Sequence, residues 1–376
     1  MFSFGKKKSS DSDAPLTQDV VLSALARVPD PELKKDLVAL KMVKDVAITG
    51  GEVAFTIVLT TPACPFKAQI EKDARAAVSA SGAKKVSVKC EADVQYDPRL
   101  RAKYDIGVKN VITVASGKGG VGKSTIATNI AVALAKAGAA VGLMDGDLYG
   151  PNIPMMLGIK GQPVAIGGKM MPLSGHGVRV MSMGMLVEAG TPIIWRGPML
   201  DQAVKQFLGD VMWGSLDYLV IDLPPCTVDV QLSLSQALPL TGASIVTTPQ
   251  AVALADVVKG VAMFQQLQVP ILGIVENMSY YICPDCGRKE ALFGSGGGQA
   301  MADKFKVPLL GQVPFERRVR EGGDEGQPIV VRAPAEGPAA KAITAIAQTV
   351  AAKIAVQNAT APKKSMIRAP ELKFVG

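Results

Sequence analysis

A glycine-rich segment carries the strongest chemical signal in this 376-residue sequence. It satisfies the pattern G-x-x-x-x-G-K-[ST], in which backbone N–H groups surround phosphate oxygens and the following helix N-terminus faces the same anion. The pattern predicts that Lys123 reaches the β- and γ-phosphates of a nucleotide and that the Ser124 hydroxyl binds Mg²⁺. The segment consists of Gly117, Lys118, Gly119, Gly120, Val121, Gly122, Lys123, Ser124 and Thr125.

Three aspartates at predicted strand ends could complete the same site. Asp222 follows the apolar run 219–221, where a carboxylate can reach Mg²⁺ through water, and Asp145 and Asp147 follow the apolar run 141–144. Hydrolysis needs a group that orients the attacking water, so an aspartate is expected beside the γ-phosphate. One strand-end aspartate commonly forms only a turn. Three of them behind a phosphate loop favour a catalytic role.

Cys283 and Cys286 form a C-x-x-C pair, in which two thiolates on one tight turn can face one metal. Tetrahedral Zn²⁺ and a [4Fe–4S] cluster each take four ligands, whereas one chain offers only one such pair. A two-fold symmetric dimer would bring two pairs together. The spacing leaves zinc and iron–sulfur equally open, with a redox dithiol as the third interpretation.

The remaining sulfur-containing residues carry weaker signals. Cys64, between Pro62-Ala63 and Pro65, precedes a predicted helix, and thiols near helix N-termini are often reactive, although a buried structural role is the alternative. Cys90 lies in an alternating strand and is expected in the core. The clustered methionines are expected to fill gaps in apolar packing rather than to bind a soft metal: Met155, Met156, Met170, Met171, Met181, Met183 and Met185.

The scaffold that positions these residues is predicted from hydrophobic periodicity. From residue 111 onward, short buried strands alternate with helices, which is typical of a parallel sheet with crossover connections. The last helix presents Ile343, Ile346, Val350 and Ile354 on one face and ends near residue 355. The sequence therefore predicts an α/β domain at 109–355, with strands at 111–114, 140–144, 218–221, 244–247, 271–275 and 309–313.

A smaller pattern precedes that domain. Val21, Leu25 and Val28 have helical spacing, and apolar residues then alternate on either side of Gly50-Gly51, which predicts a helix followed by a β-hairpin. A second helical face and a third strand follow. We therefore expect a small α+β domain at 15–96 and a linker at 97–108, with flexible basic tails at 1–14 and 356–376.

Composition limits the classes of function. Hydrophobic residues make up 48% and charged residues 20%, as in a globular protein, and no apolar run reaches the roughly 18 residues that a spanning helix needs. Five thinly spread cysteines suit reduced cytosolic thiols, and the first residues lack the apolar segment of a signal peptide. A single histidine, His176, excludes a His-rich metal site. The net charge of +8 is too mild to demand nucleic acid, so we expect a cytoplasmic protein with neither membrane nor nucleic-acid partners.

These motifs together resemble a known group of ATPases. Lys118 inside the phosphate loop is similar to the deviant Walker A of the MinD/ParA/nitrogenase-iron-protein group, whose extra lysine reaches the nucleotide of the other subunit in an ATP-sandwich dimer. Within that group, four segments closely resemble Mrp/ApbC-type iron–sulfur cluster carriers. The segment 60–65, T-T-P-A-C-P, looks like the small cluster-assembly domain often fused ahead of that ATPase. The four carrier-like segments are 145–152, 195–199, 217–225 and 276–287.

The resemblance implies a P-loop NTPase that uses ATP, Mg²⁺ and a [4Fe–4S] cluster. Asp147 would then orient the hydrolytic water, Asp222 would be the Walker B carboxylate, and Asn277 would contact the adenine. Cys283 and Cys286 would bind the cluster at a homodimer interface. The implied partners are a cluster-assembly scaffold and the apo iron–sulfur proteins that receive the cluster.

The chain departs from the family pattern after Asp222. The family usually reads D-L-P-P-G-T-G-D, whereas Cys226 and Val228 replace both glycines here. Losing the backbone freedom of glycine beside the γ-phosphate could slow switching or hydrolysis. Cys226 is interpreted as a tolerated substitution rather than as a redox-sensitive thiol.

Two other functions stay open at the level of sequence. A MinD/ParA-like positioning ATPase would need a terminal amphipathic helix or a concentrated basic face, and the lysines of these tails lack interleaved large apolar residues. A nucleotide-regulated, zinc-bridged scaffold would use the same two cysteines. Metal content separates these interpretations.

Overall fold

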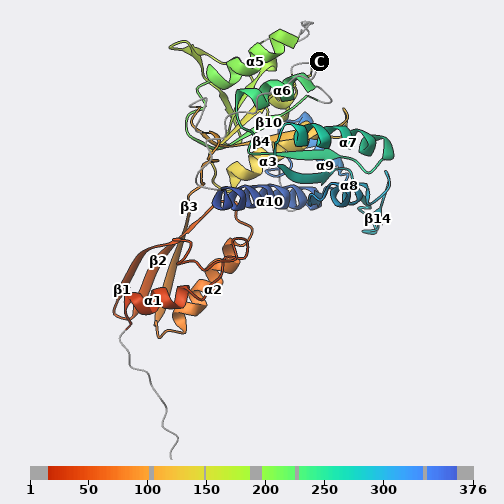
Figure 1. Cartoon of the computed structure of the whole chain (residues 1–376). Coiled ribbons are helices and arrows are strands. Elements are labelled where there is room, and N and C mark those ends of the chain that lie inside the picture. Colours follow the sequence, from red (N-terminus) through yellow and green to blue (C-terminus); the bar gives the residue numbers. More distant parts are fainter. Residues whose placement is uncertain are drawn as a thin grey trace, which may run out of the picture. The chain divides into compact units, whose positions relative to one another are not determined.

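The computed structural model describes residues 16–100, 106–147, 150–186, 197–224, 228–332 and 337–361. The expected tail at 1–14 and most of the expected tail at 356–376 lie outside these ranges. The chain divides into two compact units, each described here by itself (Figure 1). The small unit comprises Met1–Leu59 and Phe66–Ala92, and the large unit comprises Thr60–Pro65 and Asp93–Gly376.

The small unit is a three-stranded sheet with two helices. Its elements are α1 (Gln18–Leu25), β1 (Val43–Thr49), β2 (Glu52–Leu59), α2 (Lys67–Ser79) and β3 (Lys85–Ala92). Strands β1 and β2 form an antiparallel hairpin, and its turn contains Gly50 and Gly51, whose φ angles of 61° and 87° suit a glycine pair. Strand β3 pairs in parallel with β2 after the α2 crossover. The predicted small α+β domain is confirmed.

The large unit contains an eight-stranded sheet in the order β15-β12-β11-β4-β10-β5-β9-β8. All neighbouring strands are parallel except the antiparallel pair of β8 and β9, which confirms the predicted α/β class. The strands are β4 (Val108–Ser116), β5 (Val141–Asp145), β8 (Leu173–Gly175), β9 (Val178–Ser182), β10 (Leu216–Asp222), β11 (Gly242–Thr247), β12 (Ile271–Glu276) and β15 (Leu309–Gln312).

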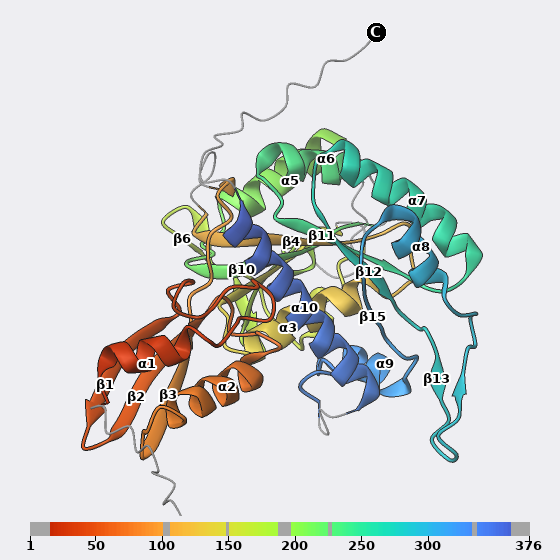
Figure 2. The ribbon, with the colours of Figure 1, turned by 60° about the horizontal axis from the view of Figure 1, so that its bottom comes forward.

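Both faces of this sheet are covered by helices (Figure 2). Helices α3 (Lys123–Lys136) and α10 (Pro338–Thr360) share one apolar core with Tyr218 and Val220 of β10. The alternate residues of the same strand, Leu219 and Ile221, belong to the second core. Side chains of successive strand residues point to opposite faces, so a strand buried on both faces is apolar throughout. The helices that contribute to the second core are α5 (Gly197–Gly209), α6 (Val228–Ala237), α7 (Ala251–Gln266) and α8 (Gly297–Phe305).

Shorter elements occupy the connections. Strands β8 and β9 were not predicted, because β8 has only three residues and meets β9 at a tight turn around His176. The connections also hold α4 (Ile153–Met156), the 3₁₀ helix η2 (Met183–Met185), α9 (Arg317–Asp324) and the paired strands β6 (Ala165–Ile166) with β7 (Lys169–Met170) and β13 (Tyr281–Ile282) with β14 (Lys289–Glu290).

Helix α10 is the one helix in the described ranges that is long and apolar enough, by composition, to cross a membrane. Its apolar stripe of Ile343, Ile346, Val350 and Ile354 is at most 1% exposed. The stripe belongs to the same core as α3. Burial inside the large unit therefore accounts for its composition.

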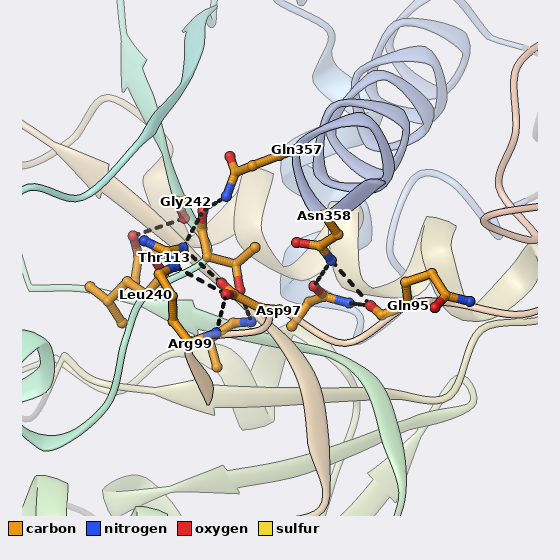
Figure 3. A network of polar contacts seen from close by, with 11 residues as sticks. Gln95, Asp97, Arg99, Thr113, Leu240, Gly242, Gln357 and Asn358 are labelled. Carbon is orange, nitrogen blue, oxygen red and sulfur yellow. Dashed lines mark hydrogen bonds and ion pairs between the residues drawn. The ribbon is translucent and has the colours of Figure 1, made fainter. Parts of the chain in front are cut away.

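The end of α10 is anchored by a polar network (Figure 3). Gln357 Nε2 donates to Thr241 O at 2.9 Å, and Asn358 Nδ2 donates to Asn110 Oδ1 at 2.8 Å. The helix therefore continues to Thr360, past the expected domain end at 355.

The same network includes the start of the expected linker at 97–108. The Asp97 side chain is 1% exposed and forms an ion pair of 2.7 Å with Arg99, which also donates to Leu240 O at 3.1 Å. These buried contacts make the first residues of the segment part of the large unit.

Candidate functional site

The phosphate-loop segment joins β4 to α3, as the motif requires. Gly120 and Gly122 have φ angles of 81° and 82°, a backbone region that favours glycine. A Cβ atom at Gly117 would collide with the backbone of Asp256 in α7, so this glycine permits close helix packing. Glycines at these positions let the loop turn sharply and leave its backbone N–H groups available to an anion.

Lys123, Ser124 and Asp222 are in direct contact at the carboxyl ends of β4 and β10. Lys123 Nζ donates to Asp222 Oδ1 at 2.7 Å, and Ser124 Oγ donates to Asp222 Oδ2 at 2.5 Å. The Lys123 and Asp222 side chains are 6% and 0% exposed, so this is a buried ion pair. The hydroxyl and carboxylate oxygens are the hard donors that Mg²⁺ prefers, so these residues fit the ion that a P-loop site requires.

Asp145 lies beside Asp222, in register on the neighbouring strand β5. It is 1% exposed and accepts hydrogen bonds from Ser182 Oγ at 2.9 Å, the Asp147 N–H at 3.2 Å and the Ile153 N–H at 3.4 Å. Burial, reinforced by the charge of Asp222, raises the pKa of Asp145 to about 8. Burial also raises the pKa of Asp222, and the Lys123 ammonium and the Ser124 hydroxyl oppose that shift.

The raised pKa of Asp145 predicts a pH dependence of stability in the nucleotide-free protein. The folded state holds this proton more tightly than the unfolded chain, so the free energy of unfolding should fall between about pH 4 and about pH 8, by at most about 1.4 kcal/mol per pH unit, and then level off. Urea unfolding across this range measures the slope. Asp145→Asn cannot ionise and should lose this part of the slope, whereas Asp210→Asn at an exposed position should keep it. A wild-type slope in Asp145→Asn would contradict the prediction.

Three other predicted residues lie around this centre. Asn277 Nδ2 donates to Val121 O at 2.9 Å, so the proposed adenine contact lies against the phosphate loop. Asp147 is half-buried, and its Oδ1 accepts the Gly150 N–H at 3.3 Å. The Lys118 side chain is exposed, and its backbone carbonyl accepts a hydrogen bond from Ser116 Oγ at 3.0 Å. Gly119 is also exposed, and Thr125 is half-buried in the first turn of α3.

Cys283 and Cys286 lie in the turn between β13 and β14, on a hairpin that extends from the large unit (Figure 2). Cys283 is half-buried and Cys286 is exposed. Backbone N–H groups of Cys286 and Asp285, together with the Cys286 thiol, donate to the Cys283 sulfur and lower the pKa of that thiol. Hydrogen bonds to a thiolate favour the charged form, which is the form that binds metals.

The described part of the chain holds no group of three or more His, Cys, Asp or Glu side chains that could bind a metal ion. Within the described ranges, the hairpin therefore has two thiols and no third side chain of these types close enough to complete a metal site. The predicted nucleotide-binding residues and the cysteine pair lie on different elements, the loop between β4 and α3 and the turn between β13 and β14.

The other sulfur residues are only partly as expected. Cys64 is buried, and it belongs to the Thr60–Pro65 segment, which clusters with the large unit. In that segment Thr61 Oγ1 accepts a hydrogen bond from the hydroxyl of Tyr218 at 3.0 Å.

Cys90 is half-buried rather than in the core, and burial raises the pKa of its thiol. Met181 and Met185 are buried as expected, but Met155 is 53% exposed and fills no gap. Cys226 lies outside the described residues.

Two residues with clear structural roles were missed from the sequence. Ser182 ends β9, in register beside Asp145, and its Oγ also accepts the Gly184 N–H at 3.1 Å. The alternation of Val178 and Val180 before it was the available signal. Glu276 precedes Asn277 at the end of β12 and is fully buried. A charged residue at the end of an apolar strand is the sequence pattern that could have identified it.

Comparison with known proteins agrees with these features. The family model described as "NUBPL iron-transfer P-loop NTPase" matches residues 107–351, and the model described as "Iron-sulfur cluster assembly protein" matches residues 18–90. An iron–sulfur cluster carrier protein of Synechocystis sp. is 53% identical over 349 residues, which cover 91% of this chain and 99% of that protein. A protein of the same name from Escherichia coli is 42% identical over 354 residues, covering 93% and 96% of the two chains.

A solved structure provides an independent comparison. The nucleotide-binding protein from Archaeoglobus fulgidus, in complex with ADP, is 38% identical, has a TM-score of 0.54, and covers 61% of this chain and 91% of its own. The resemblance seen in the sequence is thereby confirmed. With its phosphate loop, strand-end aspartates and full-length relatives, the chain belongs to the family of iron–sulfur cluster carrier proteins, P-loop NTPases with a small iron–sulfur cluster assembly domain ahead of the NTPase domain.

Proposed function

We propose that this protein hydrolyses ATP and carries a [4Fe–4S] cluster between the two subunits of a cytoplasmic homodimer, from a cluster-assembly scaffold to apo iron–sulfur proteins. The observation that carries the proposal is the cysteine hairpin. It presents two thiols, one of them hydrogen-bonded as a thiolate would be, and its own chain offers no completing ligands among the described residues. A two-fold copy would supply the other two.

The nucleotide half of the proposal rests on the buried contacts of the phosphate loop. Lys123 would neutralise charge on the transferred phosphate, while Ser124 and Asp222 would hold Mg²⁺, which when bound stabilises the charge on the β- and γ-phosphates. Asn277 would contact the adenine from its position against Val121. The ADP held by the Archaeoglobus fulgidus relative supports a nucleotide in this fold.

Dimerisation is supported by Lys118. Lys123 already supplies a buried cation in the phosphate loop of its own chain, whereas the Lys118 side chain is exposed. Its exposure suits a side chain that reaches across a subunit interface to the partner's phosphates. Sandwiched nucleotides would then link ATP binding to dimer geometry, and so to the pairing of the two cysteine hairpins.

Metal analysis of anaerobically purified protein tests the proposal as a whole. The expected result is about four iron and four sulfide per dimer, with dimers in sedimentation. Zinc without sulfide would instead establish the zinc-bridged scaffold. Absence of any metal, together with ATP turnover, would contradict the carrier function and leave a positioning ATPase as the better account.

Asp147→Asn is expected to suppress hydrolysis while ATP binding stays largely intact. The amide cannot orient and polarise the attacking water as a carboxylate does. The hydrogen bonds of Lys123 and Ser124 go to Asp222 rather than to Asp147, so the phosphate cradle remains. We expect kcat to fall on the order of a hundredfold with little change in nucleotide affinity. Steady-state turnover and equilibrium ATP binding measure the two quantities. If affinity fell and turnover at saturation did not, Asp147 would have no role in the chemical step.

A further inference from the structure

Glu276, at the carboxyl end of β12, has a fully buried carboxylate that accepts three hydrogen bonds. Ser279 Oγ and Gln312 Nε2 donate to Oε1 at 2.5 and 2.7 Å, and the Gly298 N–H donates to Oε2. None of the ion pairs in the described ranges involves this carboxylate. A buried carboxylate is costly unless its oxygens are hydrogen-bonded, so these three donors are what make its position tenable.

Two of the donors flank the segment that carries the cysteine pair. We define the cysteine loop as residues 280–297, which contain β13, Cys283, Cys286 and β14. Ser279 immediately precedes this loop and Gly298 immediately follows it. The Glu276 carboxylate therefore closes the base of the cysteine loop by binding both of its ends.

The structure is shaped for this close approach. A Cβ atom at position 298 would lie 2.8 Å from Glu276 Cβ and 3.0 Å from Oε2, and one at position 297 would lie 2.8 Å from Pro249 O. A glycine at position 298 lets the first turn of α8 approach the carboxylate this closely. Gly298 is therefore required by the carboxylate, whereas Gly297 is required by packing against Pro249 and Gly296 by its φ angle of 75°.

The neighbouring residue connects the same point to the nucleotide. Asn277 donates through its side chain to Val121 O of the phosphate loop and through its backbone N–H to Thr247 O at 2.7 Å. On the other side, the Ser279 N–H donates to Val313 O at 2.9 Å and the Phe315 N–H donates to Tyr280 O at 2.7 Å. Asn277, the proposed adenine contact, is thus joined by one peptide bond to Glu276, whose carboxylate binds both ends of the cysteine loop.

We propose that Glu276 is a positioning residue that couples nucleotide binding at the phosphate loop to the conformation of the cysteine loop. This inference rests on the proposed function, because it takes Asn277 as the nucleotide contact and the cysteine loop as the place of the cluster. A shift of Asn277 on nucleotide binding moves the backbone of Glu276. The carboxylate transmits that movement to both ends of the loop, since it holds both.

Hydrogen exchange of the metal-free, full-length protein tests the coupling, with Mg²⁺ and ADP as the probe. In wild type, ADP should slow exchange in the phosphate loop and, by about fivefold or more, in the cysteine loop. Glu276→Gln keeps the side-chain shape but points an NH₂ group at one or more of the three donors. The variant should keep ADP protection of the phosphate loop and lose it in the cysteine loop.

Two further variants make the test independent of folding effects. Ser279→Ala removes one donor and leaves the other two, so it should reduce the ADP effect on the cysteine loop without abolishing it. Glu290→Gln changes a carboxylate within the loop itself, paired with Arg288 at 2.7 Å, and should behave as wild type. Wild-type coupling in Glu276→Gln, or an ADP effect confined to the phosphate loop in the wild-type protein, would overturn the inference. No iron enters this measurement, so its outcome is separate from the test of cluster binding.

Discussion

Lys123→Ala is expected to lower ATP turnover by on the order of a hundredfold to a thousandfold, and to weaken binding of Mg²⁺-bound nucleotide. The Lys123 ammonium is the buried cation of the phosphate loop, 2.7 Å from Asp222 Oδ1. Its removal takes away the charge that stabilises the transferred phosphate. It also leaves the buried Asp222 carboxylate without its ion-pair partner, which disfavours the ionised form that Mg²⁺ binding needs.

Turnover and nucleotide affinity in the variant check this expectation. Lys136→Ala is the matched control, because Lys136 lies in the last turn of the same helix and donates to Val330 O at 3.1 Å, at the opposite end of α3 from the phosphate loop. It should keep wild-type turnover. Wild-type turnover in Lys123→Ala would refute the assignment of the phosphate loop.

Cys283→Ser and Cys286→Ser should each remove the cluster from the whole dimer. By two-fold symmetry each single substitution deletes two of the four proposed ligands, and a serine hydroxyl is a poor substitute for a thiolate. Iron and sulfide per dimer, the visible absorbance of the cluster and the dimer fraction in sedimentation are the measurements. We expect the first two to fall to background.

Cys90→Ser is the control for loss of a thiol, because Cys90 lies in β3 of the small unit and should leave cluster content unchanged. A monomer that retains a complete [4Fe–4S] cluster would contradict the bridging arrangement and would point to Cys64 and Cys226 as ligands. Retention of the cluster in both hairpin variants would remove the C-x-x-C pair from the function and leave an ATPase without a known cargo.

Much of the large unit could be predicted from the sequence, because its strands and its phosphate loop are marked by residues that are close together in the chain. Strands buried on both faces must be apolar throughout, so the central strands β4, β5, β10, β11 and β12 could be found from short apolar runs such as 219–221. The phosphate loop was equally visible, since its glycines and lysine are consecutive in the chain. Strands β8 and β9 were missed because they meet at a tight turn and the first is only three residues long.

The domain limits could not be predicted in the same way. Gln357 and Asn358 form hydrogen bonds to residues more than a hundred positions away along the chain, and Arg99, the ion-pair partner of Asp97, does the same with Leu240 O. No local pattern reports such contacts. The Thr60–Pro65 segment is a similar case. Its sequence suggests a turn between a strand and a helix, yet it clusters with the large unit and bonds to Tyr218.

The sequence by itself indicated the groups proposed to carry the chemistry of this protein: a phosphate-binding loop, strand-end carboxylates and a pair of thiols, each recognised by the spacing of its residues. The tertiary structure alone decided how these groups are supported. Ser182 holds Asp145 from a strand that the sequence did not reveal, and Glu276 joins two ends of a loop 18 residues long. Both depend on buried hydrogen bonds between distant segments, whose partners are fixed only when the sheet has formed.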